Sequence, residues 1–519
     1  MPLLAALSEP HQTALGMLAT GLLLATAALF SGTVGRRGVP VVLLFLAIGV
    51  MAGSQGLFAW LANGAPDAFS GIEFSDYGIA YRLGTVALVL ILFDGGLNTR
   101  IAAVRGAVAP ALVLATAGVA VTMVIVAALA RLVGLPWGLA LLLGAVVSST
   151  DAATVFSVLR GGGISLRQRV GATLELESGL NDPLAVILTA VVTTALLAGG
   201  SWSPVQLIGE VVLQFVIGAA VGLLVAAATR RILRRRLLAA GLYPVVTLAA
   251  AGVAWSTATL TLGSGFLAVY VAGLALGNGP LPYRKGLTRV HDFLAWFAQV
   301  GMFLMLGLLV FPGAVLEVWW QGVIIALGLM FIARPVSVWL GLLPFGFQPR
   351  ETVFMGWLGL RGAVPIVLAT WPIMMGVEGG QQVFNLVFFI VGLSALVQGW
   401  SARWMTDKLG MRSSDPGPPE TTLDMVSTRL LTSRAKSFPV RVDSPVAGSC
   451  LRDIIFPVGS AVMLVTRGDD LIAPRGDTVL LPGDHVHVFF RPEHRACMSG
   501  LFEPRDIEPD VTHEEPLGT

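Results

Sequence analysis

Glu177-Ser178-Gly179-Leu180-Asn181-Asp182-Pro183 lies near the start of a hydrophobic run that continues to about residue 199. The stretch therefore places two carboxylates and one amide in a segment long enough to cross a membrane. A charged side chain at the centre of a bilayer costs at least about 2.5 kcal/mol, and such groups usually mark the path of an ion or a proton. We therefore predict a membrane transporter that handles small cations and protons.

The composition agrees with a membrane location for most of the chain. Its 519 residues are 55% hydrophobic and 12% charged, whereas soluble globular proteins carry about 25% charged residues. Residues 1–412 hold 23 Lys and Arg and 15 Asp and Glu, and residues 413–519 hold 10 and 16. The first part is predicted to be a polytopic α-helical membrane domain, and the last part a mildly acidic soluble domain. The basic residues gather between hydrophobic segments, so no nucleic-acid partner is expected.

About thirteen hydrophobic segments are long enough, or nearly so, to cross a hydrocarbon core about 30 Å thick. They lie near residues 14–30, 39–53, 79–97, 107–130, 136–158, 174–199, 205–229, 240–260, 264–277, 293–311, 319–343, 352–376 and 384–402. No Lys or Arg precedes Arg36, so the first segment lacks the basic start of a signal peptide and is interpreted as a retained helix.

The basic residues also orient the chain. If the N-terminus is outside, thirteen crossings place 19 Lys and Arg residues in cytoplasmic loops and leave only Arg82 and Arg131 outside. This asymmetry is the one that the positive-inside rule describes. We therefore expect a multi-pass protein of the inner (plasma) membrane with a cytoplasmic C-terminus. Cys450 and Cys497 then lie in a reducing compartment, where no disulfide framework is expected.

Polar side chains of the 174–199 segment fall on two neighbouring faces of one helix. Residues three, four and seven positions apart share a face, so Glu175, Ser178 and Asp182 form one stripe, and Glu177 and Asn181 form the next. Carboxylate, hydroxyl and amide oxygens are the ligands that hard cations prefer. Asp182 is the best candidate for the ion-binding group. Glu175 lies near the cytoplasmic end, where it is either solvated or accessory to the site.

Ser148-Ser149-Thr150-Asp151 interrupts the apolar run of the 136–158 segment. Hydroxyl side chains replace lost backbone hydrogen bonds where a membrane helix unwinds, and freed carbonyls then face a cavity. Asp151 is either a structural cap on helix-end amides, which favour negative charge, or a member of the site. Thr150 has the better claim to a ligand role.

Gly359-Leu360-Arg361-Gly362-Ala363-Val364-Pro365 places an arginine inside the 352–376 segment. Arg361 does not lose its proton, so it requires a carboxylate within the membrane, and we expect Glu177 to be that partner. The pair would link two helices and leave Asp182 unpaired. Arg334, which precedes a proline, is interpreted as a structural or snorkelling residue.

Other polar groups carry less information. Asp94, near the inner end of the 79–97 segment, either guards the cytoplasmic approach or is simply solvated. None of the six histidines falls clearly within a predicted span, so a histidine proton relay is not expected. No phosphate-binding loop, metal-ligand cluster or nucleophile arrangement is visible, so we expect neither an enzyme nor a cofactor.

Together these motifs resemble bacterial NhaP-type cation/proton antiporters of the sodium/proton exchanger superfamily (monovalent cation:proton antiporter family 1). The likeness covers about residues 12–405, and the matching motifs are Phe93–Leu97, Thr150-Asp151, Glu177–Asp182 and Gly359–Pro365. The resemblance implies two inverted repeats, a crossover of two interrupted helices, and a homodimer with mobile core domains. Many relatives carry glutamate at Asp94 and proline at Ala152, and these departures leave the family assignment intact.

The resemblance also implies roles for the polar residues. Asp182 would bind the cation and the proton in turn, beside an ion pair of Glu177 and Arg361. Exchange is typically electroneutral where asparagine precedes the key aspartate, as Asn181 does here. The residues expected near the ion are Asn181, Ser178, Thr150 and Asp151.

The soluble part begins after the linker-like stretch Ser413–Pro419. Residues 461–465 and 485–490 alternate apolar and polar side chains around a turn at 482–484, which predicts a small β-rich α/β domain. Residues from about 424 to 495 resemble the TrkA-C (RCK-C) domain. This likeness implies a dimeric module that senses a small, nucleotide-type molecule, and it favours K⁺ as substrate; a role in assembly or stability alone is the alternative. The expected domains are 1–410 (exchanger), 411–423 (linker), 424–500 (TrkA-C-like) and 501–519 (acidic tail).

The expected function is exchange of K⁺, or alternatively Na⁺, for H⁺ by alternating access. Burial favours the protonated carboxyl of Asp182, whereas a bound cation favours the carboxylate, so the group holds one or the other. A TrkA-C-regulated cation channel would need a filter of repeated backbone carbonyls, and the sequence has no TVGYG-like loop. A carrier of organic substrates fits the carboxylate-rich site less well. Proton movement coupled to cation movement distinguishes an antiporter from a channel.

Overall fold

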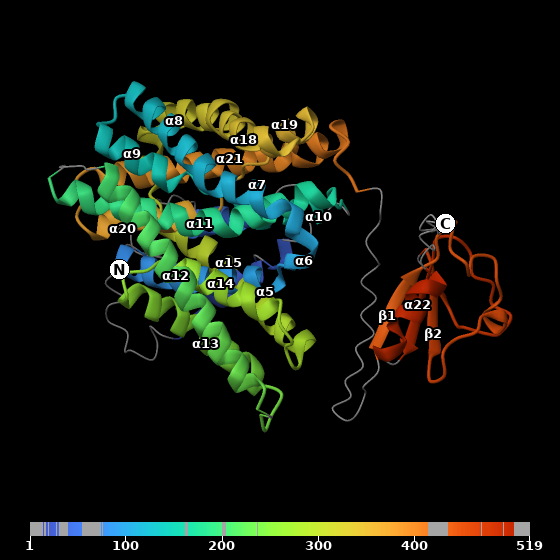
Figure 1. Ribbon diagram of the computed structural model, residues 1–519. Coiled ribbons are helices and arrows are strands. Elements are labelled where there is room, and N and C mark those ends of the chain that lie inside the picture. The colour runs from blue at the N-terminus through green and yellow to red at the C-terminus, as the bar shows by residue number, and fades with distance from the viewer. Residues whose placement is uncertain are drawn as a thin grey trace, which may run out of the picture. The chain divides into compact units, whose positions relative to one another are not determined.

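The computed structural model in Figure 1 shows a large helical part and a small part that contains a β-sheet. It describes residues 14, 17–18, 20–26, 28–30, 40–53, 74, 76–160, 164–199, 204–235, 237–413, 434–468, 470–490 and 492–502. The chain divides into two compact units, Met1–Ser414 and Asp415–Thr519, and each is described by itself. Most of the expected linker and of the expected acidic tail lies outside the described residues.

Within the described residues, eight helical segments are long and apolar enough to cross a membrane. They are α5 (Tyr77–Asn98), Arg105–Leu132, α11 (Gln168–Leu197), Ile208–Leu233 of α12 (Pro204–Leu233), α13 (Leu242–Leu260), α15 (Arg284–Leu308), Trp319–Phe345 and α21 (Gly380–Lys408). Five shorter apolar helices are Thr20–Phe30, α3 (Val41–Ala52), α9 (Trp137–Val146), α14 (Gly265–Gly277) and α20 (Ala363–Met374). The polytopic helical fold is confirmed. Two helices begin earlier than predicted, α11 at Gln168 and α15 at Arg284.

Two of the spans are interrupted. One consists of α9 and α10 (Ala152–Arg160), and the other of α19 (Pro349–Trp357) and α20. The breaks touch, because the amide of Asp151 donates to the carbonyl of Leu360 over 2.8 Å. Non-helical backbone at membrane depth requires such partners, since lipid supplies none. The predicted crossing of two interrupted helices is confirmed.

The same order of elements occurs twice. A long span containing a π-helical turn comes first, then a broken helix, then a helix of 30 residues (α11) or 29 residues (α21). The first long span contains α7 (Val108–Val113), the π-turn Leu114–Gly118 and α8 (Val119–Leu132), and the second contains α17 (Trp319–Gly328), the π-turn Leu329–Ala333 and α18 (Arg334–Leu342). Four spans, α12 to α15, separate the triplets, so the second triplet enters from the side opposite to the first. This is the arrangement of inverted repeats.

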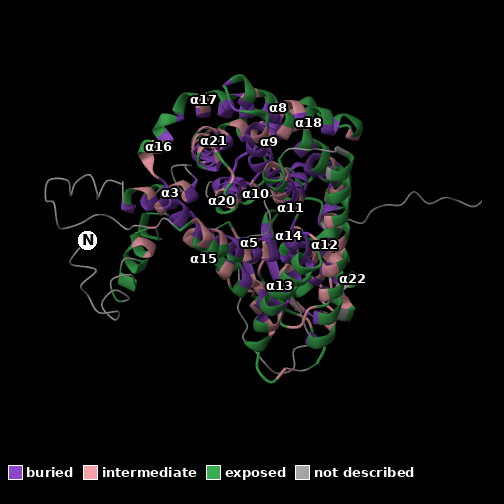
Figure 2. Cartoon of the chain, turned by 90° about the vertical axis from the view of Figure 1, so that its left-hand side faces the viewer, coloured by how far each residue is buried: buried purple, intermediate pink, exposed green. Residues whose placement is uncertain are grey.

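The helices of the membrane unit form two groups (Figures 1 and 2). The core bundle contains the two triplets, that is α7 to α11 and α17 to α21. The panel contains α3, α5, α12, α13, α14 and α15. In Figure 2 buried residues gather where the groups meet, and exposed residues cover the outer sides of α8, α12 and α17. The short helices α6 (Ile101–Val104) and α16 (Pro312–Glu317) are connections.

The second unit is a small α/β domain with one antiparallel sheet. Its strands are β1 (Arg434–Pro439), β2 (Ala461–Arg467), β3 (Asp470–Ile472) and β4 (Asp484–Phe490), in the order β1-β4-β2-β3. Alternate residues of β4 enter a core that includes Val486, Val488 and Phe490, together with Met498 and Phe502 of α22 (Arg495–Phe502). The α/β domain expected from the alternating pattern is confirmed.

Candidate functional site

The candidate ion site surrounds the middle of α11, next to the two breaks. Pro183 lies inside this helix and has no N–H, so the carbonyl of Gly179 lacks its usual intrahelical donor. Asp182 is partly exposed, whereas Asn181 and Glu177 are buried. The helix thus presents a half-buried carboxylate directly beside buried polar groups.

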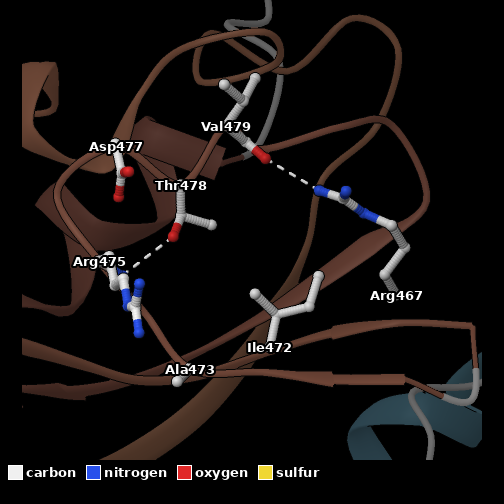
Figure 3. Close-up of a pocket in the computed structure, with 7 residues that line it drawn as sticks. All are labelled: Arg467, Ile472, Ala473, Arg475, Asp477, Thr478 and Val479. Carbon is white, nitrogen blue, oxygen red and sulfur yellow. Dashed lines mark hydrogen bonds between the residues drawn. The ribbon is translucent and has the colours of Figure 1, made fainter.

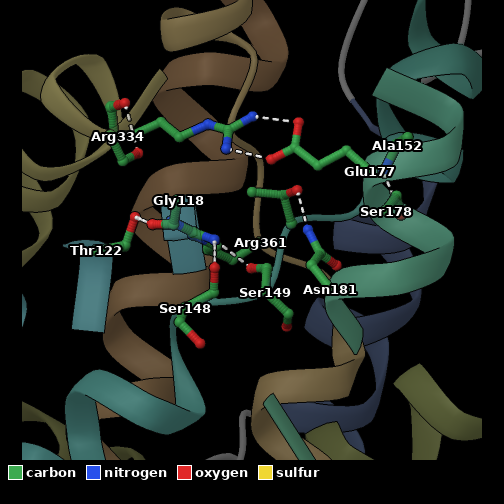
Figure 4. Close-up of polar contacts among 12 residues, drawn as sticks. Gly118, Thr122, Ser148, Ser149, Ala152, Glu177, Ser178, Asn181, Arg334 and Arg361 are labelled. Carbon is green, nitrogen blue, oxygen red and sulfur yellow. Dashed lines mark hydrogen bonds and ion pairs between the residues drawn. The ribbon is translucent and has the colours of Figure 1, made fainter. Parts of the chain in front are cut away.

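Two other side chains of α11 hold the first break in place (Figure 4). The amide nitrogen of Asn181 donates to the hydroxyl of Thr150 over 2.7 Å, and the hydroxyl of Ser178 accepts from the amide of Ala152 over 3.1 Å. The bond to Ser178 satisfies a backbone amide that the break leaves without a helix partner, and the bond of Asn181 ties the Thr150 side chain to α11. The predicted site residues Asn181, Ser178 and Thr150 are therefore brought together.

Asp151 caps the N-terminus of α10. Its carboxylate accepts from the amide of Thr154 over 3.0 Å and from the hydroxyl of Thr154 over 2.6 Å. A carboxylate at this end also complements the helix dipole. The structure thus supplies the capping role that the sequence left open for Asp151. The carboxylate of Asp151 is also close enough to Asp182 for the two acidic groups to interact electrostatically.

Oxygen atoms without protein partners lie at the site. Within the described residues, Oδ1 of Asn181 and Oγ of Ser149 are buried and accept no hydrogen bond. Ser149 neighbours Asp182, as does Arg361. A buried acceptor without a donor is costly unless a ligand satisfies it. Carboxylate, amide and hydroxyl oxygens together suit a monovalent cation, which here is cargo and not a resident cofactor. Ser149 was not singled out from the sequence.

The predicted pair of Glu177 and Arg361 is wrong. Glu177 pairs instead with Arg334 of α18 in a two-pronged contact, in which Nη2 lies 2.9 Å from Oε2 and Nη1 contacts Oε1 (Figure 4). Glu177 is 1% exposed and Arg334 3%. The sequence argument that a membrane arginine requires a carboxylate applied equally to Arg334, which was interpreted only as structural or snorkelling.

Arg361 is bound to backbone instead. Its Nη1 donates to the carbonyl of Ser148 over 2.8 Å and contacts the carbonyl of Ser149 (Figure 4). These carbonyls follow the C-terminal end of α9, where unpaired acceptors and the helix dipole favour a cation. Arg361 joins the two breaks for this reason, while it stays within electrostatic reach of Asp182 and Glu177.

The two glycines that flank Leu360 and Arg361 make room for charged neighbours. A methyl group on Gly359 would lie 2.7 Å from Cγ of Arg334, and one on Gly362 would lie 2.0 Å from Oδ2 of Asp151. Both distances are far below van der Waals contact. The motif Gly359–Gly362 is thus fitted to both the ion pair and the capped break.

Polar residues also gather at the end of α5 nearest the start of α11. The side-chain amide of Asn98 donates to Asp94 over 2.9 Å and to Asp292 over 3.2 Å. The hydroxyl of Thr99 donates to Glu175 over 3.2 Å. Asp94 is partly buried and Glu175 is exposed, so both carboxylates lie at one end of the helices, apart from the breaks, and this end is called the mouth below.

One histidine lies inside a span, contrary to expectation. His291 belongs to α15, is 1% exposed, and its Nε2 lies 2.8 Å from the hydroxyl of Thr247. The expectation failed because α15 begins at Arg284, nine residues ahead of the predicted start at 293.

The small domain has a shallow cavity of about 470 Å³ beside β3 (Figure 3). Its lining residues are Arg467, Ile472, Ala473, Arg475, Asp477, Thr478 and Val479. Arg467 is held by Asp484 through contacts of 2.7 and 2.8 Å and also donates to the carbonyl of Val479. Burial alone would raise the pKa of Asp484, but the Arg467 guanidinium and the Leu481 amide hold that pKa below its ordinary value.

Comparison with known proteins agrees with this geometry. Residues 22–408 match the family described as "Sodium/hydrogen exchanger, transmembrane", and residues 436–497 match the TrkA-C domain. The chain is 40% identical over 488 residues to the K(+)/H(+) antiporter NhaP2 of Shewanella oneidensis, an alignment that covers 93% of this chain and 82% of that protein. It is 40% identical over 461 residues to the K(+)/H(+) antiporter NhaP of Alkalimonas amylolytica, covering 87% and 77%.

A solved structure shares the fold. The sodium proton antiporter MjNhaP1 from Methanocaldococcus jannaschii superimposes with a TM-score of 0.62 at 24% identity, covering 75% of this chain and 99% of that one. Since that identity is low, the likeness concerns the fold alone. The order of spans, the crossed breaks and the match over residues 22–408 lead to one assignment. This chain belongs to the sodium/hydrogen exchanger family.

Proposed function

We propose that this protein exchanges K⁺ for H⁺ across the inner membrane, with Asp182 as the group that carries both ions in turn. The observation that carries the proposal is the contrast within α11. Glu177 has a bidentate arginine, whereas Asp182 is partly exposed among oxygens of Asn181 and Ser149 that have no donor within the described residues. The carboxylate of Asp182 in this position must either take up a proton or bind a cation.

The exchange follows from competition for one carboxylate. Burial favours the protonated form and a bound cation favours the charged form. If only loaded carriers reorient, one proton crosses for each cation, and Asn181 adds no second charge, so the exchange is electroneutral. Thr150, Ser178 and Asp151 support the site through the break they hold. The family is one of transporters, and we assign no enzymatic step and no cofactor.

K⁺ is preferred as the substrate because two relatives at 40% identity are named K(+)/H(+) antiporters. Na⁺ is the second candidate, since a relative that is 29% identical over 362 residues is named the Na(+)/H(+) antiporter NhaS2 of Synechocystis. We infer an outside N-terminus, a cytoplasmic C-terminus and a homodimer with a moving core bundle. We further infer that the TrkA-C domain, about residues 424–500, senses a small nucleotide-type molecule, for which the cavity in Figure 3 is the candidate position.

Everted membrane vesicles test the proposal directly. Vesicles that hold an acidic interior are given K⁺, Na⁺, Rb⁺ or Li⁺ in turn, and proton release is followed by fluorescence dequenching. We expect the largest response with K⁺ and no coupled response from Asp182→Asn at equal protein level. Cation-driven proton movement by Asp182→Asn would refute the assignment of the site, and K⁺ flux without proton movement would indicate a channel.

A further inference from the structure

Tyr270 of α14 lies where the panel meets the core bundle. It is 2% exposed, and its ring packs against α11 at Gly179. A methyl group on Gly179 would lie 2.5 Å from Cε2 and Cζ of Tyr270 and 2.7 Å from Oη. Carbon atoms in contact are about 3.5–4.0 Å apart, so the ring occupies a notch that only glycine leaves open. The phenol thus reaches from one helix group into the other.

This notch is one helical turn from the proposed ion site. Gly179 precedes Asp182 by three residues, so both lie on the same face of α11. Glu175 lies one further turn toward the mouth that contains Asp94, which we propose to be cytoplasmic, and accepts a hydrogen bond from Thr99. The phenol of Tyr270 therefore stands between that mouth and Asp182.

The hydroxyl of Tyr270 is in an unusual position for a buried polar group. Within the described residues no hydrogen bond of good geometry reaches it, and its polar neighbours are the Thr99 side chain, which is close enough to interact, and the Glu175 carboxylate. A buried tyrosine hydroxyl ordinarily finds a partner, and one left without a partner is costly. A passing cation or a water molecule of its shell would supply that partner.

We propose that Tyr270 closes the passage between the cytoplasmic mouth and Asp182, and that its hydroxyl contacts the monovalent cation on its way from Glu175 and Thr99 to Asp182. The inference rests on the proposed function and names a further specificity and positioning residue for it. Tyr270 belongs to the panel and Gly179 to the core bundle. Movement of the core bundle relative to the panel must therefore separate Gly179 from the ring of Tyr270. The contact is then made in one state of the transport cycle and broken in the other.

The first test separates the hydroxyl from the ring. Tyr270→Phe keeps the ring and removes the oxygen, so KM for K⁺ measured from the cytoplasmic face in everted vesicles is expected to rise about three- to tenfold, the factor supplied by one neutral hydrogen bond. The maximal rate, and KM from the outer face in right-side-out vesicles, should stay within about twofold. Tyr81→Phe is the matched control, since Tyr81 is a partly buried tyrosine that packs on Trp371 of α20. An unchanged cytoplasmic KM in Tyr270→Phe would overturn the role of the hydroxyl.

The second test addresses the notch. Gly179→Ala drives a methyl group into the ring and should lower the maximal rate about tenfold, because the state in which ring and helix are in contact becomes overpacked. In the double variant Gly179→Ala with Tyr270→Ala the clash is removed, and the maximal rate should recover at least in part. Absence of recovery, with folded protein confirmed by size-exclusion chromatography, would overturn the role of the contact. If the wild-type protein itself shows no coupled exchange, the proposed function fails and not this inference alone.

Discussion

Glu177 and Asp182 are acidic residues less than two turns apart on the same helix, yet their surroundings differ. Glu177 is 1% exposed and both of its oxygens contact the guanidinium of Arg334. Asp182 is partly exposed, and its nearest cation, Arg361, donates to the carbonyls of Ser148 and Ser149. The comparison shows that the role of each carboxylate depends on whether an arginine neutralises its charge. A carboxylate neutralised in bidentate fashion holds the fold, whereas one without such a partner remains available to a proton or a metal ion.

The largest expected effect concerns the compensated carboxylate. Glu177→Gln leaves Arg334 buried without a counter-charge, and breaking a buried ion pair costs about 3–5 kcal/mol. We expect little folded protein, measured by fluorescence-detected size-exclusion chromatography and thermal stability in detergent. Asp182→Asn is the control and should fold normally, since it removes a charge that has no bidentate partner. Normal folding of Glu177→Gln would contradict the proposed difference between Glu177 and Asp182, because the ion pair of Glu177 with Arg334 would then not be needed for folding.

A smaller effect is expected at the arginine that joins the breaks. Arg361→Lys keeps the charge but replaces the rigid guanidinium, whose Nη1 contacts both carbonyls, with a flexible ammonium group that is not held in the same position. Loss of one charge-assisted hydrogen bond is worth about 1.5–3 kcal/mol, which corresponds to a fall of about tenfold or more in exchange rate if the bond is needed in transport. The measurement is K⁺-driven dequenching at equal protein level. A wild-type rate would show that backbone contacts by Arg361 do not shape the site near Asp182.

Asn181→Asp tests whether the number of carboxylates at the ion site determines how many protons are exchanged for each cation. The change places a second carboxylate beside Asp182 and removes the donor that Asn181 gives to Thr150. We expect exchange that responds to membrane potential, because a loaded site with an additional negative charge no longer cycles neutrally. Rates are compared with and without a potential set by a permeant anion. A potential-sensitive wild type would contradict electroneutral exchange, and an insensitive variant would contradict the role given to Asn181.

The smallest effect is expected for a similar arginine–carboxylate pair in the aqueous domain. Asp484→Asn removes the negative charge and one of the two oxygens that accept from Arg467 and Leu481, and it should destabilise the sheet by about 1–3 kcal/mol, with exchange activity retained. Hydrogen exchange of residues 461–490 measures the effect. The pKa of Asp484 is lower in the folded domain than in the unfolded chain. This stabilisation is therefore fully present above the unfolded value of about 4 and is lost as the pH falls through the lower folded value.

The variant should lack this loss of stability toward acid pH. Asp453→Asn is the matched control, because Asp453 is 63% exposed and lies 3.7 Å from an exposed Arg452. Such surface pairs contribute about 0–1 kcal/mol, so little change is expected. Equal effects of Asp484→Asn and Asp453→Asn would show that burial does not strengthen the pair.

The predictable part of this protein consists of properties that each segment carries alone. The length of an apolar run and the charges at its ends place a span in a membrane whatever its neighbours are. In the same way, Ser148–Asp151 indicated a break, because its polar side chains interrupt an apolar helix locally, whereas a second interrupted helix was expected from the family resemblance. The exchanger family followed from these motifs, and its assignment is confirmed.

Only the tertiary structure decided which charges meet. Arg334 and Arg361 are both buried arginines in apolar segments, and nothing in their spacing tells which one reaches Glu177. Likewise, the bond of Asn181 with Thr150, the bond of Arg361 with the carbonyl of Ser148 and the contact of Tyr270 with Gly179 join residues that lie far apart in the sequence. The physical reason is that hydrophobicity and charge act along one segment, whereas an ion pair or a close packing contact depends on how two segments are rotated and offset against each other.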